Sequence, residues 1–150
     1  MKIIAMLMLT TALLFSLQSG ETIDKQTLQE LGLIEDKVYV VSFFASWCSS
    51  CKKELPILCQ LHEKSETYNF SIVGIDVDKD INKAKRFQSS IRDGEGINFR
   101  VINDPQNKLI NTFDPIGMPA MYFIKNGKVI DVIFGAVNDI DKKILEKVSQ

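Results

Sequence analysis

The chain has 150 residues, of which 45% are hydrophobic and 25% are charged, and its formal net charge is −1. This balance is that of an ordinary globular protein, and the length fits one domain. The 18 basic residues are scattered along the chain, which argues against a nucleic-acid-binding protein. The cysteines number three, so at least one thiol has no partner within the chain.

The N-terminal segment, residues 1–20, differs in kind from the rest. One lysine is followed by an apolar stretch over 3–17 and then by small and polar residues, which is the layout of a secretory signal. The stretch is shorter than the ~20 residues of a comfortable membrane span. Ser19 or Gly20 would end it, although neither follows a clean cleavage pattern. We therefore expect a cleaved signal or a retained membrane anchor, followed by a single domain over 21–150.

The elements after this segment follow from hydrophobic periodicity. Apolar runs rich in β-branched and aromatic residues predict buried strands, and a period of three to four residues predicts helices. Asn126-Gly127 is the preferred turn of a tight β-hairpin, and Pro56 is expected to kink the helix that contains it. The predicted order is helix or loop 21–37, strand 37–44, helix 49–64, strand 70–77, helix 80–91, strand 98–104, helix 105–113, hairpin 119–134 and helix 138–148.

This order predicts an α/β fold with a mixed central sheet. The strand-helix-strand start favours parallel pairing through a crossover, and the hairpin near the C-terminus adds an antiparallel pair. Helices are expected on both faces of the sheet. Asp80 is expected to cap its helix, and Pro105 is expected in the first turn of the helix that follows it.

The segment "FFASWCSSCKKELP" (43–56) carries two cysteines two residues apart, between a predicted strand and a predicted helix. Cys48 is expected at the helix N-terminus, where unpaired N–H groups and the helix dipole stabilise a thiolate. Such a thiolate attacks a disulfide, and Cys51, one turn further on, resolves the mixed disulfide that forms. The spacing alone also allows a structural disulfide or half of a metal site.

A zinc site is the alternative with the most ligands, because Cys48, Cys51, Cys59 and His62 spell C-x2-C-x7-C-x2-H. On a helix, however, the last two would lie roughly 12 to 16 Å from Cys51, at 1.5 Å per residue. Zinc–sulfur bonds are only ~2.3 Å long. We therefore expect no metal. Cys59 is interpreted as a small buried hydrophobe and His62 as an exposed or partly buried helix residue.

Two segments together resemble the thioredoxin superfamily, in its branch of TlpA-, ResA- and DsbE-like exported oxidoreductases. "VVSFFASWCSSCKKELP" is similar to the active-site segment, and "GMPAMYFIKNGKVI" is similar to the strand that begins at a cis-proline facing it. The similarity covers roughly residues 37–148. It implies a thioredoxin fold, a substrate-docking edge at Met118 and Pro119, and Trp47 at the border of the site. It implies no bound cofactor beyond a redox-active Cys48–Cys51 disulfide.

Proton transfer is the part of the mechanism that the resemblance leaves open. Where thioredoxins carry a buried Asp, this chain has Ser42, a poor base at neutral pH. Asp78 and Asp80, after the second strand, are the other candidates, and each is better interpreted as a helix cap or a solvated loop charge. Ser49-Ser50 lack the His that strong oxidants of the superfamily typically place between the cysteines, which favours a reductase.

The resemblance therefore implies a monomeric, exported thiol–disulfide oxidoreductase of the bacterial periplasm, held at the inner membrane if the N-terminal segment is retained. It implies disulfides of exported proteins, such as apocytochrome c, as substrates. It also implies a membrane thiol–disulfide carrier as electron donor and no nucleic acid as partner. A periplasmic oxidase or isomerase is the first alternative, and a non-catalytic thioredoxin-like binding module is the second.

Overall fold

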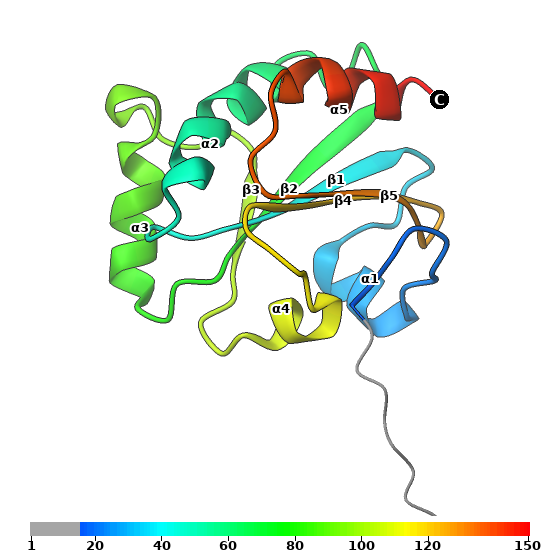
Figure 1. Cartoon of the computed structure of the whole chain (residues 1–150), viewed down its shortest axis with the longest axis horizontal. Helices are drawn as coiled ribbons and strands as arrows, with labels where there is room; N and C mark the ends of the chain where they lie inside the picture. Colours follow the sequence, from blue (N-terminus) through cyan, green and yellow to red (C-terminus); the bar gives the residue numbers. More distant parts are fainter. Residues whose placement is uncertain (1–15) are drawn as a thin grey trace, which may run out of the picture.

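A mixed five-stranded sheet forms the centre of the molecule in the computed structural model, which describes residues 16–150 (Figure 1). The strands lie in the order β3-β2-β1-β4-β5. β2 pairs in parallel with β1 and β3, whereas β4 is antiparallel to β1 and β5. The predicted mixed sheet is therefore confirmed. Its strands are β1 (Val38–Phe44), β2 (Phe70–Asp76), β3 (Arg100–Asn103), β4 (Ala120–Lys125) and β5 (Lys128–Phe134).

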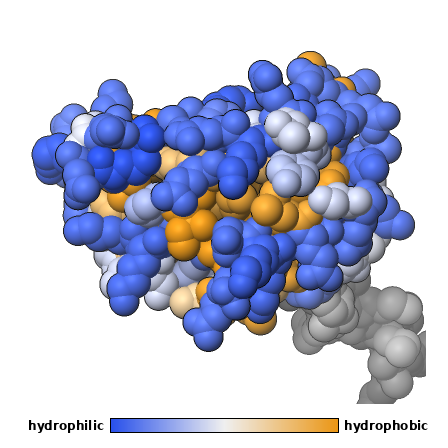
Figure 2. All heavy atoms as spheres, turned by 90° about the horizontal axis from the view of Figure 1, so that it is seen from above, coloured by the Kyte–Doolittle hydropathy of each residue, from blue (hydrophilic) through white to orange (hydrophobic). Residues whose placement is uncertain are grey.

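Helices cover both faces of this sheet, as expected (Figure 1). Side chains of β1 alternate between the two layers: Val40 and Phe44 pack in one hydrophobic core, and Val41 and Phe43 pack in the other. Figure 2 shows one face of the molecule, where polar residues form most of the surface and hydrophobic residues are visible between them. One face carries α2 (Ser49–His62), α3 (Ile81–Ser90) and α5 (Ile140–Val148), and the other carries α1 (Lys25–Leu31) and α4 (Lys108–Phe113).

The turn between β4 and β5 is the tight hairpin that the sequence predicts. Asn126 and Gly127 both have positive φ, at 50° and 74°, which is the backbone of a type I′ turn. The first described residues then run beside β5. Gly20 donates its N–H to the carbonyl of Val129 at 2.7 Å, and Val129 donates to the carbonyl of Glu21 at 2.9 Å. These bonds cover part of the edge of β5.

One predicted helix start is wrong. α4 begins at Lys108, three residues after Pro105. The cause is Asp104, whose buried carboxylate accepts the N–H groups of Lys108 at 2.8 Å and Ile110 at 3.0 Å. This side chain satisfies the free N–H groups of the first turn, so the helix begins after it rather than at the proline. α2 contains Pro56 and is helical on both sides of it, so this proline does not end the helix.

None of the helices within residues 16–150 combines the length and the apolar character that a membrane span requires. The expected signal or anchor over 1–20 lies mostly outside the described residues.

Candidate active site

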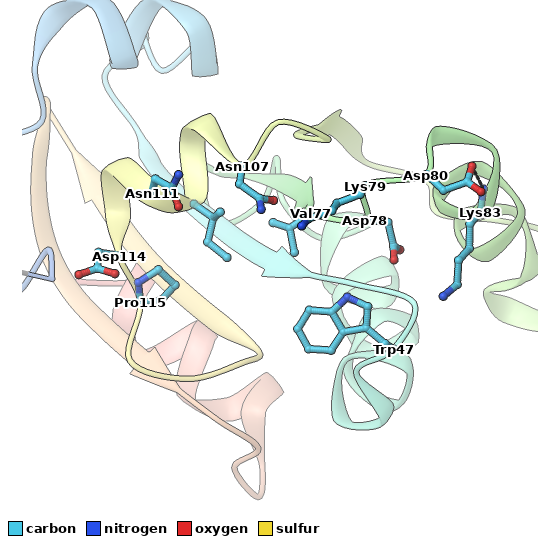
Figure 3. A pocket seen from close by; sticks show the side chains of 11 residues that line it. Trp47, Val77, Asp78, Lys79, Asp80, Lys83, Asn107, Asn111, Asp114 and Pro115 are labelled. Atoms are coloured by element: carbon cyan, nitrogen blue, oxygen red, sulfur yellow. Dashed lines mark hydrogen bonds between the residues drawn. The ribbon is translucent and has the colours of Figure 1, made fainter.

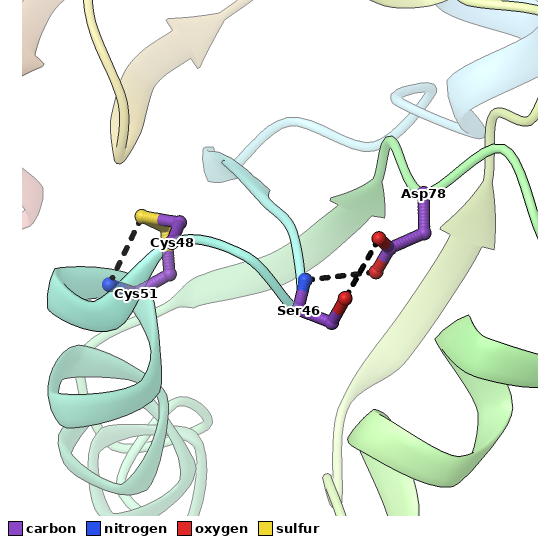
Figure 4. The surroundings of a disulfide bond; sticks show 4 residues. All are labelled: Ser46, Cys48, Cys51 and Asp78. Carbon is purple, nitrogen blue, oxygen red and sulfur yellow. Dashed lines mark hydrogen bonds between the residues drawn. A yellow bond between two sulfur atoms is a disulfide. The ribbon is translucent and has the colours of Figure 1, made fainter.

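A disulfide joins Cys48 to Cys51 at the start of α2, after the turn that follows β1 (Figure 4). Cys48 is the N-cap residue of this 14-residue helix and has an extended backbone, with φ −96° and ψ 102°. The N–H of Cys51 donates to Sγ of Cys48 at 3.2 Å, so a sulfur takes the place that a side-chain oxygen takes in common helix caps. Both predicted positions, at the helix N-terminus and in its first turn, are confirmed.

The two sulfur-bearing residues are buried, but their neighbour is not. Cys48 is 7% exposed and Cys51 is 1% exposed, whereas Trp47 is 63% exposed. Trp47 lies in the turn between β1 and α2, directly before Cys48. Its indole is therefore the largest apolar group presented to solvent next to the disulfide.

A second segment reaches the same end of the sheet from far along the chain. Phe43, near the end of β1, pairs with Ala120 at the start of β4, so the residues that precede Ala120 lie beside those that follow β1. They are Met118 and Pro119, which are joined by a cis peptide bond. Met118 packs against the hydrophobic core that contains Cys48. Its backbone N–H and C=O form no hydrogen bond to any described residue.

Asp78, which follows β2, is hydrogen-bonded to the turn between β1 and the disulfide (Figure 4). It is 3% exposed, and its carboxylate accepts the N–H and the hydroxyl of Ser46, each at 2.8 Å. The interpretation of Asp78 as a solvated loop charge is therefore wrong, because the contact across 32 residues buries it. Asp80 caps α3, as expected, by accepting the N–H groups of Asn82 and Lys83.

A further carboxyl lies behind this contact. Asp76, the last residue of β2, is fully buried. It accepts the N–H of Asp78 at 2.9 Å and the amide of Gln88 at 2.9 Å. Burial raises the pKa of Asp76 above its ordinary value. The sequence prediction did not include this residue, because it is part of a strand that reads as apolar.

The prediction also missed Glu54, which is one turn after Cys51 on α2. Its side chain is only 8% exposed and has no hydrogen-bond partner among the described residues. Burial raises the pKa of Glu54 to about 7. It lines a small pocket of about 240 Å³ together with Ile57 and Val137. The available signal was its spacing, because Glu54 occupies the same helical face as Cys51 and Leu58.

The other two residues of the C-x2-C-x7-C-x2-H pattern lie in the second half of α2. Cys59 is fully buried and free, and burial raises the pKa of its thiol. His62 is half-buried, with its ring edge-on to Phe99 at a centroid distance of 6.1 Å. Both interpretations from the sequence are confirmed. Within residues 16–150, no group of three or more His, Cys, Asp or Glu side chains is placed to hold a metal ion.

The fold and the disulfide at its helix N-terminus define a thioredoxin-like redox protein. The chain belongs to the AhpC/TSA family, whose family model matches residues 9–133. It is 28% identical over 153 residues to the thiol-disulfide oxidoreductase ResA of Bacillus thuringiensis (strain Al Hakam), covering 89% of this chain and 86% of the relative. It is 26% identical over 111 residues to ResA of Bacillus subtilis (strain 168), covering 73% and 60%.

Comparison with solved structures gives the same fold. A crystal structure from Chlorobium tepidum, described as a thiol:disulfide interchange protein DsbE, superimposes with a TM-score of 0.70 at 25% identity. The match covers 88% of this chain and 95% of that one. The thioredoxin domain of an oxidoreductase from Bacteroides vulgatus gives a TM-score of 0.68 at 19% identity, covering 89% and 99%, and supports the fold. The predicted thioredoxin fold is thus confirmed, and the chain is a thiol–disulfide oxidoreductase of the ResA and DsbE type.

Proposed function

We propose that the protein reduces disulfides in exported proteins, with Cys48 as the nucleophile and Cys51 as the resolving thiol. The observation that carries this proposal is the N–H of Cys51 directed at Sγ of Cys48 across 3.2 Å, at the start of a 14-residue helix. In the reduced protein the same N–H and the helix dipole favour a thiolate on Cys48.

The reaction then has two exchange steps. The Cys48 thiolate attacks one sulfur of the substrate disulfide, a protein–substrate S–S bond forms, and the other substrate sulfur leaves as a thiolate. Cys51 loses its proton and attacks Sγ of Cys48, which releases the second substrate sulfur. The substrate has gained two electrons, and the protein is left with the Cys48–Cys51 disulfide seen in the structure.

We assign Glu54 as the group that accepts the proton of Cys51. The two residues face the same side of α2 at i and i+3, a separation of about 5–6 Å between Cβ atoms. A carboxyl with a pKa of about 7 exchanges protons readily near neutral pH. Ser42 is buried in the middle of β1 and is not a base at that pH, so Glu54 replaces it as the candidate.

Met118 and Pro119 are proposed as the docking edge for the substrate. The backbone groups of Met118 have no partner among the described residues, and β4 begins two residues later. An extended chain can pair with such a free edge, in the manner of an added β-strand. Trp47 would border the bound segment on the side of the turn after β1.

The cellular setting that we propose rests on the same family relationship. We propose an exported protein, in line with the signal-like composition of residues 1–20. A membrane thiol–disulfide carrier would return the disulfide to its dithiol form, and apocytochrome c is a candidate substrate. An oxidase or isomerase is the second candidate function, although no His stands between the two cysteines.

The reduction potential of the Cys48–Cys51 couple tests the direction of electron flow. Equilibration in thiol–disulfide buffers is expected to give a value near −300 mV, whereas a value near −120 mV would identify an oxidant. A Cys51→Ser variant should accumulate mixed disulfides with its substrates on Cys48, and these can be identified by mass spectrometry. A purified, reduced protein that reduces no disulfide would instead identify a non-catalytic binding module.

A further inference from the structure

The residues that precede α1 are bonded to the domain from Leu17 onward (Figure 1). The N–H of Leu17 donates to the carbonyl of Phe113 at 2.9 Å. The hydroxyl of Ser19 donates to the carbonyl of Ile130 at 2.9 Å. The bonds of the next residues to β5 continue this contact. Residues 17–23 therefore form an added edge segment of the sheet, which we call the N-terminal strap.

The N-terminal strap also contributes apolar side chains to the core. Ile23 is 4% exposed, and Leu17 packs against the hydrophobic core that contains Phe113 and Tyr122. Burial of such side chains is the main favourable contribution to folding. Without the strap, the edge of β5 would also be free to pair with other chains. A segment with both roles belongs to the folded domain and not to a leader that is discarded.

Leu17 is bonded to the part of the chain that borders the redox site. Phe113 ends α4, and the two residues after it, Asp114 and Pro115, line a groove of about 560 Å³ beside Trp47 (Figure 3). The bond from Leu17 therefore holds the end of α4 from which this wall of the groove begins. We expect a chain that lacks Leu17 to hold the wall less firmly.

Cleavage of an export signal after Ser19 or Gly20 would remove Leu17 and part of the strap. Both points also match a signal peptidase poorly, because the enzyme requires small residues at positions −3 and −1. The −3 residue would be Leu17 in the first case and Gln18 in the second. The structure and the sequence thus argue against these two points for independent reasons.

The same contacts argue against a retained membrane span. Because Leu17 is bonded and packed in the domain, the apolar stretch that remains outside the strap covers residues 3–16. As a helix these 14 residues would extend only about 21 Å, whereas the hydrocarbon core of a bilayer is ~30 Å thick. A span would have to pull Leu17 out of the sheet. An apolar stretch of this length is instead typical of a signal peptide.

One bond before the strap fits a signal peptidase. Thr10 and Ala12 are the small residues at positions −3 and −1 of the bond between Ala12 and Leu13. An apolar run over 3–9 precedes them, as in the central region of a signal peptide. No other bond between this run and Leu17 has small residues at both positions.

We propose that export ends with hydrolysis of the Ala12–Leu13 bond, so that the mature protein begins at Leu13, keeps the N-terminal strap and leaves the membrane. Water supplies OH to the carbonyl of Ala12 and H to the amine of Leu13, and a signal peptidase of the exporting cell is the catalyst. The inference rests on the proposed export and adds a processing site to it. An oxidoreductase released in this way reaches disulfides throughout the exported compartment and not only at the membrane surface.

The N-terminus of the exported protein tests the cleavage point directly. The full chain with a C-terminal affinity tag is produced in a bacterial host, and its intact mass is measured in the membrane fraction and in the membrane-free exported fraction. We expect a chain that begins at Leu13, free of the membrane. A chain that begins at Gly20 or Glu21, or a full-length chain in the membrane fraction, would overturn the inference.

The proposed function is tested separately in the same preparations. Any of these forms can be assayed for the reduction of a protein disulfide, so an unexpected N-terminus leaves the oxidoreductase activity measurable. A full-length chain that stays inside the cell would count against the proposed export and against the cleavage point together. A correctly processed chain that reduces no disulfide would count against the proposed function alone.

Two matched variants separate the candidate cleavage points. Ala12→Leu removes the small residue at position −1 and keeps the stretch apolar, so we expect the mature form to be lost and the full-length precursor to collect in the membrane fraction. Ser19→Leu makes the same kind of change at the other point and is expected to be processed normally. The reverse pattern would place the cleavage inside the strap and would refute the proposal.

A second measurement tests whether the strap belongs to the folded domain. Leu17→Ala combined with Ser19→Ala removes an apolar contact and a hydrogen bond from the exported protein. We expect the ratio of folded to unfolded protein in urea denaturation to fall by at least about tenfold. Gln18→Ala, at an exposed position between them, is the control and should match the native protein. An unchanged ratio in the double variant would show that the domain does not need the strap and would overturn the argument for cleavage before it.

Discussion

Ser46 donates both its backbone N–H and its hydroxyl to the carboxylate of Asp78, at 2.8 Å each. The two residues stand 32 positions apart, one after β1 and the other after β2. The pair therefore fastens the turn that carries Trp47 and Cys48 to the rigid centre of the sheet. Since Asp78 is buried, loss of either partner leaves a polar group without compensation, which costs more than the bond itself contributes.

Replacing Asp78 by Ala tests how strongly this contact holds the turn. We expect the free energy of unfolding to fall by about 2–4 kcal/mol, because two hydrogen bonds to a charged group are lost. Urea denaturation of the oxidised protein measures it. Asp80→Ala removes an exposed helix cap two residues away and should cost only about 1 kcal/mol. A smaller loss for Asp78 than for Asp80 would mean that the turn is held by other contacts.

Glu54 is expected to make stability fall with rising pH. Its folded-state pKa, about 7, lies above the ordinary value of 4.5, so between these values the folded chain keeps a proton that the unfolded chain releases. The contribution of Glu54 to stability is highest below pH 4.5, declines up to pH 7 and then levels off, with a total loss of up to about 3 kcal/mol from this group. Urea denaturation of the oxidised protein at pH 5 and pH 8 measures the decline.

Glu54→Gln should remove that part of the decline, since the amide does not titrate. Asp76 also has a raised pKa and contributes to both proteins equally. Glu66→Gln, at an exposed position, is the matched control and should leave the decline unchanged. Identical pH dependence in the Glu54 variant and the native protein would show that this carboxyl is ionised without penalty.

The same Glu54→Gln variant is expected to slow the release of substrate from the mixed disulfide. The proton of Cys51 would lose its acceptor, and general-base contributions are typically about 100-fold or more. Pre-steady-state kinetics should show normal formation of the mixed disulfide at Cys48 and slow resolution, together with loss of the rise in rate near pH 7. A variant slow in the first step, and normal in the second, would assign Glu54 to the activation of Cys48 instead.

The parts of this site that the sequence predicts are those encoded by local pattern. The apolar run of β1, the cysteine spacing and the Asn126-Gly127 turn each act over a few residues, so their positions were found. Asp78 was interpreted wrongly and Glu54 was missed for a different reason. A carboxylate in a loop or on a helix looks solvated until the fold brings Ser46 to the first and covers the second. Such burial is a property of the tertiary structure and produces no periodic pattern in the sequence.

The two classes of cysteine should differ sharply in reactivity. In a reduced Cys51→Ser variant, Cys48 sits at a helix N-terminus and should titrate below the ordinary ~8.5 of a free thiol. Cys59 is fully buried, and burial raises its pKa. Iodoacetamide at pH 7 is therefore expected to add one label, at Cys48, as judged by mass spectrometry. Two labels appearing at similar rates would contradict both assignments.

Gly74, in the middle of β2, is expected to tolerate no side chain. A Cβ built there would stand 2.7 Å from Cε1 of Phe44 and 3.0 Å from Cε2 of Phe99, both of them buried rings. Gly74→Ala should therefore lower the free energy of unfolding by about 1–3 kcal/mol, the usual cost of overpacking. Gly117→Ala is the control, because a Cβ there meets no atom within 4 Å, and its unfolding free energy should match that of the native protein. A Gly74→Ala variant as stable as the Gly117 control would show that the rings move apart at little cost and that this part of the core is loosely packed.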